Sequence, residues 1–488
     1  MAEPRQALSI DDDDQEHFSW TPAERESFFA AIERHRRACW RVSAVSVIAV
    51  SLATFIVGVL TAPLFYALLI LIFDVAGLFS PAVPNLATAL VELMDPAMNN
   101  PESVALGAWL KIALLAALPG AVWISLVLLG LWRLLRVAAN GAADNLDVRA
   151  PNPLVLAEQR LANVIDEMAI AASLPRPRVS VARTQVVNAA VVGSDDKHTT
   201  IVVSEGLLAR LTRAEMQGVA AHLIGTIADG DMRIGQRAAL TMRFFSFVSR
   251  LATLITSPKG ELRALGRIAR TALRPTPASA KSALDELAEF FPQHKDSAAP
   301  TDANKTTWRE YAMMPLAGPL AMTGFFGGVV SMFVLGSLLA LTWRQRKYMA
   351  DASAVRLTRD PETLAGALDK MARAGGGGSL ASWAEHMSVS VPLSSRSSLL
   401  GLSLVPMFPA LHRRLRQLEK LGAAPRPPPP PGMPIERQLL VAALFTVLGV
   451  LVAILLPLLI FVSLALSMLF LGLPVAILHA LLRLVSPW

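Results

Sequence analysis

Two stretches of the sequence are too long and too apolar for a soluble protein. Val42–Phe73 contains no charged residue, and at about 1.5 Å per residue a helix of that length more than crosses a hydrocarbon core of roughly 30 Å. Ile112–Trp132 is a second uncharged run, closed by Arg133 and Arg136. The sequence therefore predicts an integral, multi-pass membrane protein.

The distribution of basic residues predicts the orientation in the membrane. Four arginines between positions 34 and 41 precede the first run, whereas the loop between the two runs has no Lys or Arg before Lys111. Short cytoplasmic segments are enriched in Lys and Arg. We therefore expect the N-terminus and the soluble region after Arg133 to be cytoplasmic, at a bacterial-type inner membrane.

Composition narrows the classes of function. The chain of 488 residues is 53% hydrophobic and carries a formal net charge of +7. Basic and aromatic residues do not alternate as in a nucleic-acid platform, so we expect the lipid bilayer and no nucleic acid as a partner. The clear spans carry almost no ionisable groups, which a transporter would normally need. The single Cys39 allows no internal disulfide.

After the second run the sequence changes to that of a soluble α+β domain. Asn152–Ser173 has helical apolar spacing, and RVSVAR and TTIVVS are short β-branched runs. In LTRAEMQGVAAHLIGTIADGD, Thr212 and Glu215 form a capping box. The helix is expected to run to about Asp229 and to end at Gly230.

The number of membrane crossings between residues 238 and 343 stays open. Ala238–Thr256 is apolar but contains Arg243 and Arg250, residues 258–310 are a polar, basic loop, and Tyr311–Trp343 is uncharged. Two spans would keep both soluble regions in one compartment; an interfacial helix with a re-entrant segment is the alternative. The predicted organisation is a cytoplasmic tail with an amphipathic helix near the membrane surface (1–41), a transmembrane pair (42–140), a first soluble segment (141–237), a membrane insert (238–343), a second soluble segment (344–424), a Pro-rich linker (425–437) and a C-terminal transmembrane hairpin (438–488).

The helix VAAHLIGTIADGD, Val219–Asp231, resembles that of a zinc peptidase. In H-E-x-x-H enzymes two histidines bind Zn²⁺ and the glutamate activates the bound water. VVNAAVVG, RQRKYMADASAVRLTRD and FPALHRRLRQLEKLGA are similar to further stretches of the family of the heat-shock peptidase HtpX and the CAAX prenyl endopeptidase. The resemblance covers about Pro153–Gly422, and it implies that 141–237 and 344–424 are the first and second peptidase-like segments of one domain. It implies an α+β, zincin-like and mostly helical soluble domain with a small sheet, combined with multiple transmembrane helices.

Carried over position by position, the resemblance implies a degenerate zinc motif. His222 matches the first zinc ligand, Leu223 stands at the position of the catalytic glutamate, and Thr226 and Lys347 replace the other two ligands. One imidazole with water cannot match a site of three protein ligands, and an ammonium group repels a cation. We therefore expect no cofactor, with zinc only if the chain is an active enzyme.

The resemblance suggests what takes the place of the metal. Asp351 matches the carboxylate that orients the first histidine. We predict a substitute polar cluster of His222, Lys347 and Asp351; the alternative is that His222 is an ordinary core histidine. Asp229 and Asp231 are expected to cap the helix end, with a rebuilt metal site as the other interpretation.

A peptide-binding sheet edge is also implied by the resemblance. The strand around Val186–Val192 matches the family's Asn-Ala-Phe-Ala segment, and an edge binds extended peptide through backbone groups without zinc. The predicted edge residues are Val187, Asn188, Ala189 and Ala190. The predicted function is that of a membrane pseudo-peptidase that binds unfolded peptide segments or regulates another membrane protein. The alternative is an active membrane zinc metalloendopeptidase in membrane protein quality control.

Overall fold

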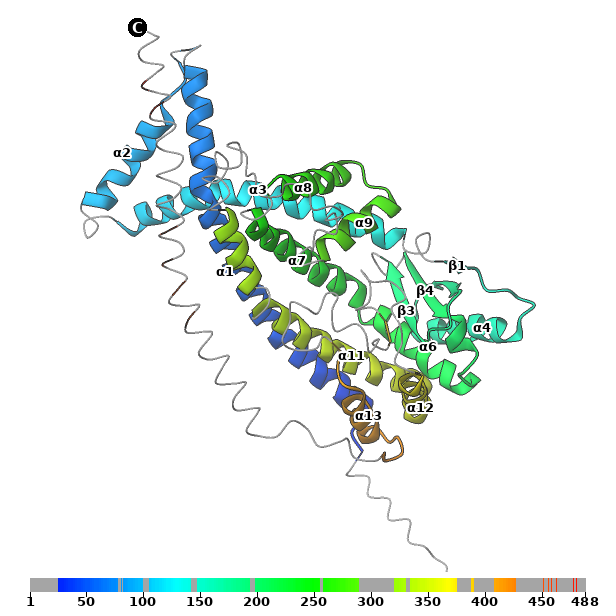
Figure 1. The fold of residues 1–488 in the computed structure, drawn as a ribbon. Helices are drawn as coiled ribbons and strands as arrows, with labels where there is room; N and C mark the ends of the chain where they lie inside the picture. The colour runs from blue at the N-terminus through cyan, green and yellow to red at the C-terminus, as the bar shows by residue number, and fades with distance from the viewer. Residues whose placement is uncertain are drawn as a thin grey trace, which may run out of the picture.

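The computed structural model describes residues 25–77, 80, 82–99, 105–141, 147–193, 198–254, 258–288, 320–330, 334–374, 388–389, 408–426 and six single positions beyond residue 450. Within them the chain is mostly helical with one small sheet (Figure 1). The first 24 residues, the Pro-rich linker from residue 427 onward and, apart from the single positions, the predicted C-terminal hairpin lie outside the described residues.

The sheet has four strands in the order β1-β2-β4-β3. β2 (Arg178–Ala182) runs parallel to β4 (Thr199–Ser204), whereas β3 (Ala189–Gly193) runs antiparallel to β4. β1 (Val148–Arg149) pairs antiparallel with β2 and is too short to show a sequence period. β3 is therefore an edge strand of the sheet, and β1 lies at the opposite edge.

The register of the strands places apolar side chains opposite one another in the core. Ile201 of β4 pairs with Val179 on β2 and with Val191 on β3. Ile201 and Val191 have no exposed surface. Full burial of such a side chain contributes about 1.5–3 kcal/mol. The β-branched runs in the sequence thus form the apolar face on which the helices pack.

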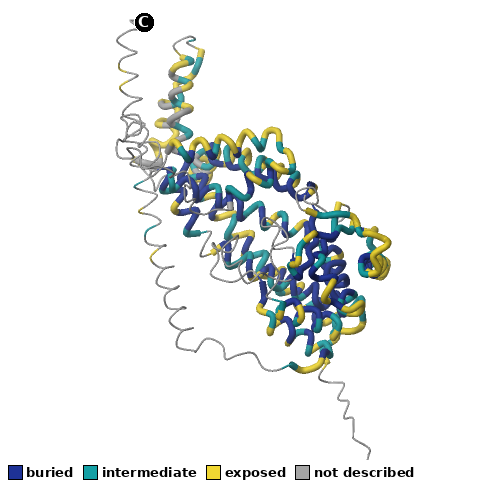
Figure 2. The backbone as a smooth tube through the Cα atoms, turned by 45° about the vertical axis from the view of Figure 1, so that its right-hand side comes forward, coloured by how far each residue is buried: buried dark blue, intermediate teal, exposed yellow. Residues whose placement is uncertain are grey.

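The soluble helices and one face of the sheet share a single apolar core. Figure 2 shows buried residues concentrated in this region of the molecule. α6 begins with the predicted capping box, in which Thr212 and Glu215 satisfy each other's backbone N–H groups, and Gly230 follows in the left-handed conformation at φ 72°. The helices are α4 (Leu156–Ala171), α5 (Glu205–Leu208), α6 (Arg213–Ala228), α11 (Gly336–Thr358), α12 (Pro361–Arg373) and α13 (Leu411–Lys420).

Two stretches of the described helices are long and apolar enough to cross a membrane: Phe28–Ala62 and Ala117–Asn140. They belong to α1 (Phe28–Gly77) and α3 (Leu106–Asn140), which α2 (Leu86–Asn99) separates in the sequence. α1 and α3 lie close together at Gly58 and Gly120, where a side chain on Gly120 would overlap the Gly58 backbone. Small residues at such a contact let membrane helices pack closely.

The N-terminal helix differs from the prediction. We expected a separate amphipathic helix near the membrane surface, but the helix continues without a break from Phe28 into α1. Ala31 and Ile32 pack against Met349 and Ala352 of α11, and Figure 1 shows α1 and α11 side by side. The apolar residues of the N-terminal segment therefore cover α11.

The predicted insert contains more helix than expected. α7 (Asp231–Arg250), α8 (Pro258–Leu273) and α9 (Pro277–Ala288) pack with α1 and α3 in a second apolar core, and the short 3-10 helix Leu251–Leu254 follows α7. The loop predicted at 258–310 is therefore helical over 258–273 and 277–288, because its apolar residues are spaced to bury one face of each helix.

α7 does not resemble the spans in α1 and α3. It is not among the described helices that are apolar enough to cross a membrane. It buries Arg243 and Arg250, and the guanidinium of Arg250 pairs with Glu261 of α8. The predicted boundary of the insert at residue 343 also falls inside α11, so the second peptidase-like segment begins on a helix that is already formed.

The contact between α6 and α12 requires Gly218. A Cβ atom at this position would lie 2.6 Å from the Leu364 backbone nitrogen. We expect Gly218→Ala to lower the free energy of unfolding by about 1–3 kcal/mol, seen as a lower Tm. Gly266→Ala on α8, where nothing lies within 4 Å, is the control and should be neutral or stabilising by up to about 1 kcal/mol. Equal melting temperatures would contradict this contact.

Candidate functional site

His222 and Asp351 face each other where α6 crosses α11. Nδ1 of His222 lies 2.9 Å from Oδ1 of Asp351, and the two side chains are 0% and 1% exposed. The helices come close because Gly225 has no side chain: a Cβ atom there would lie 2.9 Å from Cβ of Ser353. Packing thus brings together two of the three residues of the predicted cluster.

Asp351 is held by a guanidinium that the sequence analysis did not assign. Nε of Arg414 donates to Oδ2 of Asp351 at 2.9 Å and Nη2 donates to Oδ1 at 2.6 Å, the two-point geometry that makes such pairs strong. Burial alone would raise the pKa of Asp351, but Arg414, followed by His222, holds it well below its usual range. Asp351 is therefore ionised.

His222 is neutral at physiological pH. Burial lowers its pKa to about 4, although neighbouring Asp351 opposes this change, and the charges of Arg414 and Lys347 lower it further. A carboxylate beside Nδ1 favours the tautomer with the proton on that nitrogen. Nε2 has no hydrogen-bond partner within the described residues of the chain. Nδ1 lies close to Asp351 but not in the alignment of a hydrogen bond, so neither ring nitrogen has a well-aligned hydrogen-bond partner among the described residues.

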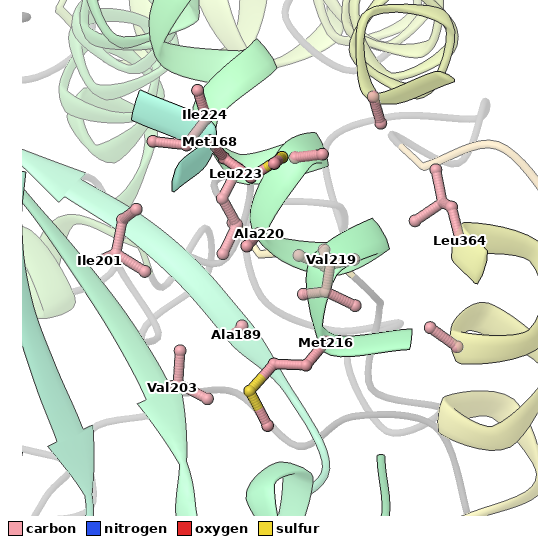
Figure 3. Close-up of a cluster of buried hydrophobic side chains, with 14 of the residues drawn as sticks. Met168, Ala189, Ile201, Val203, Met216, Val219, Ala220, Leu223, Ile224 and Leu364 are labelled. Atoms are coloured by element: carbon pink, nitrogen blue, oxygen red, sulfur yellow. The ribbon is translucent and has the colours of Figure 1, made fainter. Parts of the chain in front are cut away.

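Leu223 and Thr226 stand at the two other motif positions on α6, and each side chain contacts its own surroundings. Leu223 is 1% exposed and belongs to the main apolar core; Figure 3 shows it among Met168, Ala220 and Ile224. The hydroxyl of Thr226 donates to the backbone carbonyl of His222 at 2.9 Å. Leu223 therefore packs in the apolar core, whereas Thr226 is hydrogen-bonded to the backbone of its own helix.

Lys347 lies one helical turn before Asp351 and is 1% exposed. Its ammonium donates to the backbone carbonyl of Ser388 at 2.8 Å, and lies 5.8 Å and 5.5 Å from the ring centroids of Trp343 and Phe408. Burial lowers its pKa, and Arg414 adds to this effect. Lys347 therefore points inward beside the predicted cluster, but its hydrogen bond goes to a backbone segment.

Asp229 and Asp231 have structural partners. Asp229 is the C-cap residue of α6 and accepts a hydrogen bond from the Ser353 hydroxyl at 2.9 Å. Asp231, which we expected to cap the helix, is fully buried and pairs with Arg346 of α11. Among the described residues, no group of three or more His, Cys, Asp or Glu side chains is arranged to hold a metal ion.

The predicted peptide-binding edge is buried. Val187 and Asn188 precede β3, and Ala189 and Ala190 begin it. None of these four residues is more than 3% exposed. On the side of β3 away from β4, Ala190 pairs antiparallel with Ser388. The chain itself therefore lies along this edge.

Arg414 could have been found from its spacing. It lies on α13 between Leu411 and Leu415, and Leu415 and Leu418 are buried. A charge on the apolar face of an amphipathic helix needs a buried partner, and the carboxylate of Asp351 supplies it. Ser388 and Arg346 carried no comparable signal, because their contacts depend on how distant segments meet.

The described residues combine a mostly helical core, a small sheet and two candidate membrane spans. The profile of peptidase family M48 matches residues 156–421, more than half of the chain. The chain belongs to this family, and the resemblance to the HtpX-like peptidases and the predicted fold class are confirmed.

Similar proteins carry the name protease HtpX homolog. The one from Dictyoglomus turgidum is 29% identical over 213 residues, 44% of this chain and 54% of the relative. Those from Dictyoglomus thermophilum and Caldanaerobacter subterraneus are 28% and 26% identical, each over 54% of this chain and over 69% and 71% of the relative. The match thus spans about half the length of the first of these relatives. No solved structure matches the chain.

Removing Arg414 should destabilise the core. Arg414→Met would leave the Asp351 carboxylate buried without its main partner, and we expect a loss of about 3–5 kcal/mol in the free energy of unfolding. Thermal or urea unfolding in detergent would measure it. Arg416→Met, an exposed site on the same helix, should be nearly neutral, and Asp351→Asn combined with Arg414→Met should recover some of the loss. Full stability of the Arg414→Met variant would contradict the ion pair.

Burial of neutral His222 should make stability depend on pH. Its pKa falls from 6.5 to about 4 on folding, so between these values the unfolded chain binds a proton that the folded chain excludes. The contribution of His222 to stability is therefore largest above pH 6.5 and falls towards pH 4 by about 1 kcal/mol per pH unit. In His222→Gln this contribution disappears. Unfolding curves at several pH values should converge for wild type and variant as pH falls; parallel curves would refute a buried neutral ring.

Proposed function

We propose that this chain is a multi-pass membrane pseudo-peptidase of family M48, which binds extended peptide segments or regulates a membrane partner without hydrolysing a peptide bond. The observation that carries the proposal is the position of Lys347. The resemblance assigns this place to the third zinc ligand, yet an inward-pointing ammonium stands there and donates to the Ser388 carbonyl.

The donor set does not fit zinc. A catalytic zinc site needs three protein ligands with nitrogen, sulfur or carboxylate donors. His222 offers one free ring nitrogen, whereas the hydroxyl of Thr226 is bonded to its own helix and Lys347 has no lone pair while it is protonated. The ammonium of Lys347 would also repel a divalent cation. Neighbouring Asp351 is already paired with Arg414.

Leu223 supports the same proposal, because it stands where the resemblance puts the catalytic glutamate. Hydrolysis by this family's chemistry needs a base to deprotonate a water molecule, and an apolar side chain in the core cannot accept a proton. His222 has a lowered pKa, so it is a weak base. A change of one residue at position 223 would also place a carboxylate among apolar neighbours, which is costly.

A role in binding is compatible with these losses. β3 accepts an antiparallel partner on its outer side, and strand addition needs only backbone groups. We also propose that the peptidase-like domain is cytoplasmic, because arginines precede the uncharged run within α1 and follow the uncharged run within α3. The relatives' name describes proteases, and an active zinc metalloendopeptidase is the competing function that the following experiment separates.

The test restores the ligands in two steps. Protein purified from membranes without chelator should contain no stoichiometric zinc and should not cleave casein with zinc added. Thr226→His with Lys347→Glu, which leaves the core residue Leu223 in place, should bind about one zinc per chain because three ligands then converge. Elemental analysis of the purified protein measures the uptake.

His222→Ala in that double variant is the matched control and should abolish the uptake. Lys347→Met alone shows what the loss of the positive charge does without a new ligand. Adding Leu223→Glu to the double variant tests whether a base restores cleavage. Zinc-dependent proteolysis by the wild type that His222→Ala eliminates would overturn the proposed pseudo-peptidase.

A further inference from the structure

Two residues from outside the sheet lie along β3. The backbone N–H of Val389 donates to the Ala189 carbonyl at 2.9 Å, and Ser388 is the antiparallel partner of Ala190. Because β4 pairs with the other side of β3, these contacts occupy its outer side. Ser388 and Val389 are 1% and 0% exposed, so this short segment belongs to the folded core.

Two buried cations hold the same segment. Nζ of Lys347 donates to the Ser388 carbonyl at 2.8 Å, and Nη1 of Arg414 donates to the Val389 carbonyl at 2.7 Å. Hydrogen bonds from charged donors are stronger than those between neutral groups. Both consecutive carbonyls are therefore fixed from α11 and α13, while Val389 also packs in the main apolar core.

The geometry points to an autoinhibitory contact: Ser388 and Val389 occupy the peptide-binding edge as a built-in strand, and an extended peptide binds β3 only when it displaces them. This inference rests on the proposed function. An incoming strand would need the Ala189 carbonyl, which Val389 already uses. The resemblance assigns the position of Lys347 to a metal ligand. In this chain Lys347 instead holds Ser388 beside β3.

The hydrogen-bond pattern suggests how to lock the segment. The bond from Val389 to Ala189 makes Ala190 and Ser388 a non-hydrogen-bonded pair, whose side chains lie closest across antiparallel strands. The Ser388 hydroxyl has no hydrogen-bond partner within the described residues, so cysteine is a mild replacement there. Cys39 is the single native cysteine and is changed to serine in all variants.

The experiment uses the full chain in detergent with Ala190→Cys and Ser388→Cys. We expect a disulfide to form on mild oxidation. The probe is a fluorescein-labelled peptide with the chain's own sequence AEHMSVSVPL, followed by fluorescence anisotropy. The oxidised protein should bind it at least about tenfold more weakly than the same protein after reduction, because a tethered strand competes at a high effective concentration. Lys347→Met, which removes one hydrogen bond to the segment, should bind the probe more tightly than the protein with native Lys347.

Ala189→Cys with Ser388→Cys is the matched control. Successive side chains of a strand point to opposite faces, so this pair should not form a disulfide. Failure of the Ala190 pair to oxidise, or equal oxidation of both pairs, would overturn the placement of Ser388. Equal probe affinity of the oxidised and reduced forms would overturn the competition while leaving peptide binding intact. Disulfide formation with no probe binding in any form, Lys347→Met included, would overturn both the competition and the proposed peptide-binding function.

Discussion

The buried pair of Asp351 and Arg414 is the interaction on which the peptidase-like core depends. It joins α11 to α13 across 63 residues of sequence, and Asp351 also faces His222 of α6. Arg414 extends the connection to the Val389 carbonyl. A carboxylate in this environment is tolerated only while it is paired. The pair therefore fixes the arrangement of three helices around the place where the resemblance puts a metal, and it does so with protein charges alone.

The buried cations Lys347 and Arg346 also have partners near this pair. Lys347 is buried one turn from Asp351 and gains from that carboxylate and from Asp231, although Arg414 opposes it. Its remaining requirement is an acceptor for its hydrogen bonds, and the Ser388 carbonyl provides one. Arg346, the preceding residue, pairs with Asp231. The charge at the position that the resemblance assigns to the third zinc ligand is thus the same charge that donates to the 388–389 segment. In the proposed function this one ammonium both disfavours a divalent cation and holds the segment on β3.

The sequence predicted those features that local chemistry encodes. The capping box at Thr212, the end of α6 before Gly230 and the strands β2 and β4 all follow from spacing within a few residues. The pairing of Asp351 with Arg414 and of Asp231 with Arg346 joins residues 63 and 115 positions apart, and no local period records such a contact. The helices within the predicted loop at 258–310 were missed because charge dominated their composition, and β1 because two residues show no period.

α1 connects a candidate membrane span to this site, and α3, which contains the other candidate span, contacts β3 where Ala139 packs with Ala190 and Val192. α1 contains a candidate span and also carries Ala31 and Ile32, which pack against Met349 and Ala352. Those two residues alternate on α11 with Lys347 and Asp351, so one face of α11 contacts α1 while another holds the polar cluster. A displacement of α11 large enough to release Ser388 from Lys347 must also change the packing against α1. Because α1 is continuous from Phe28 to Gly77, the helix that contains a candidate span is the same helix that packs against α11 near Lys347 and Asp351.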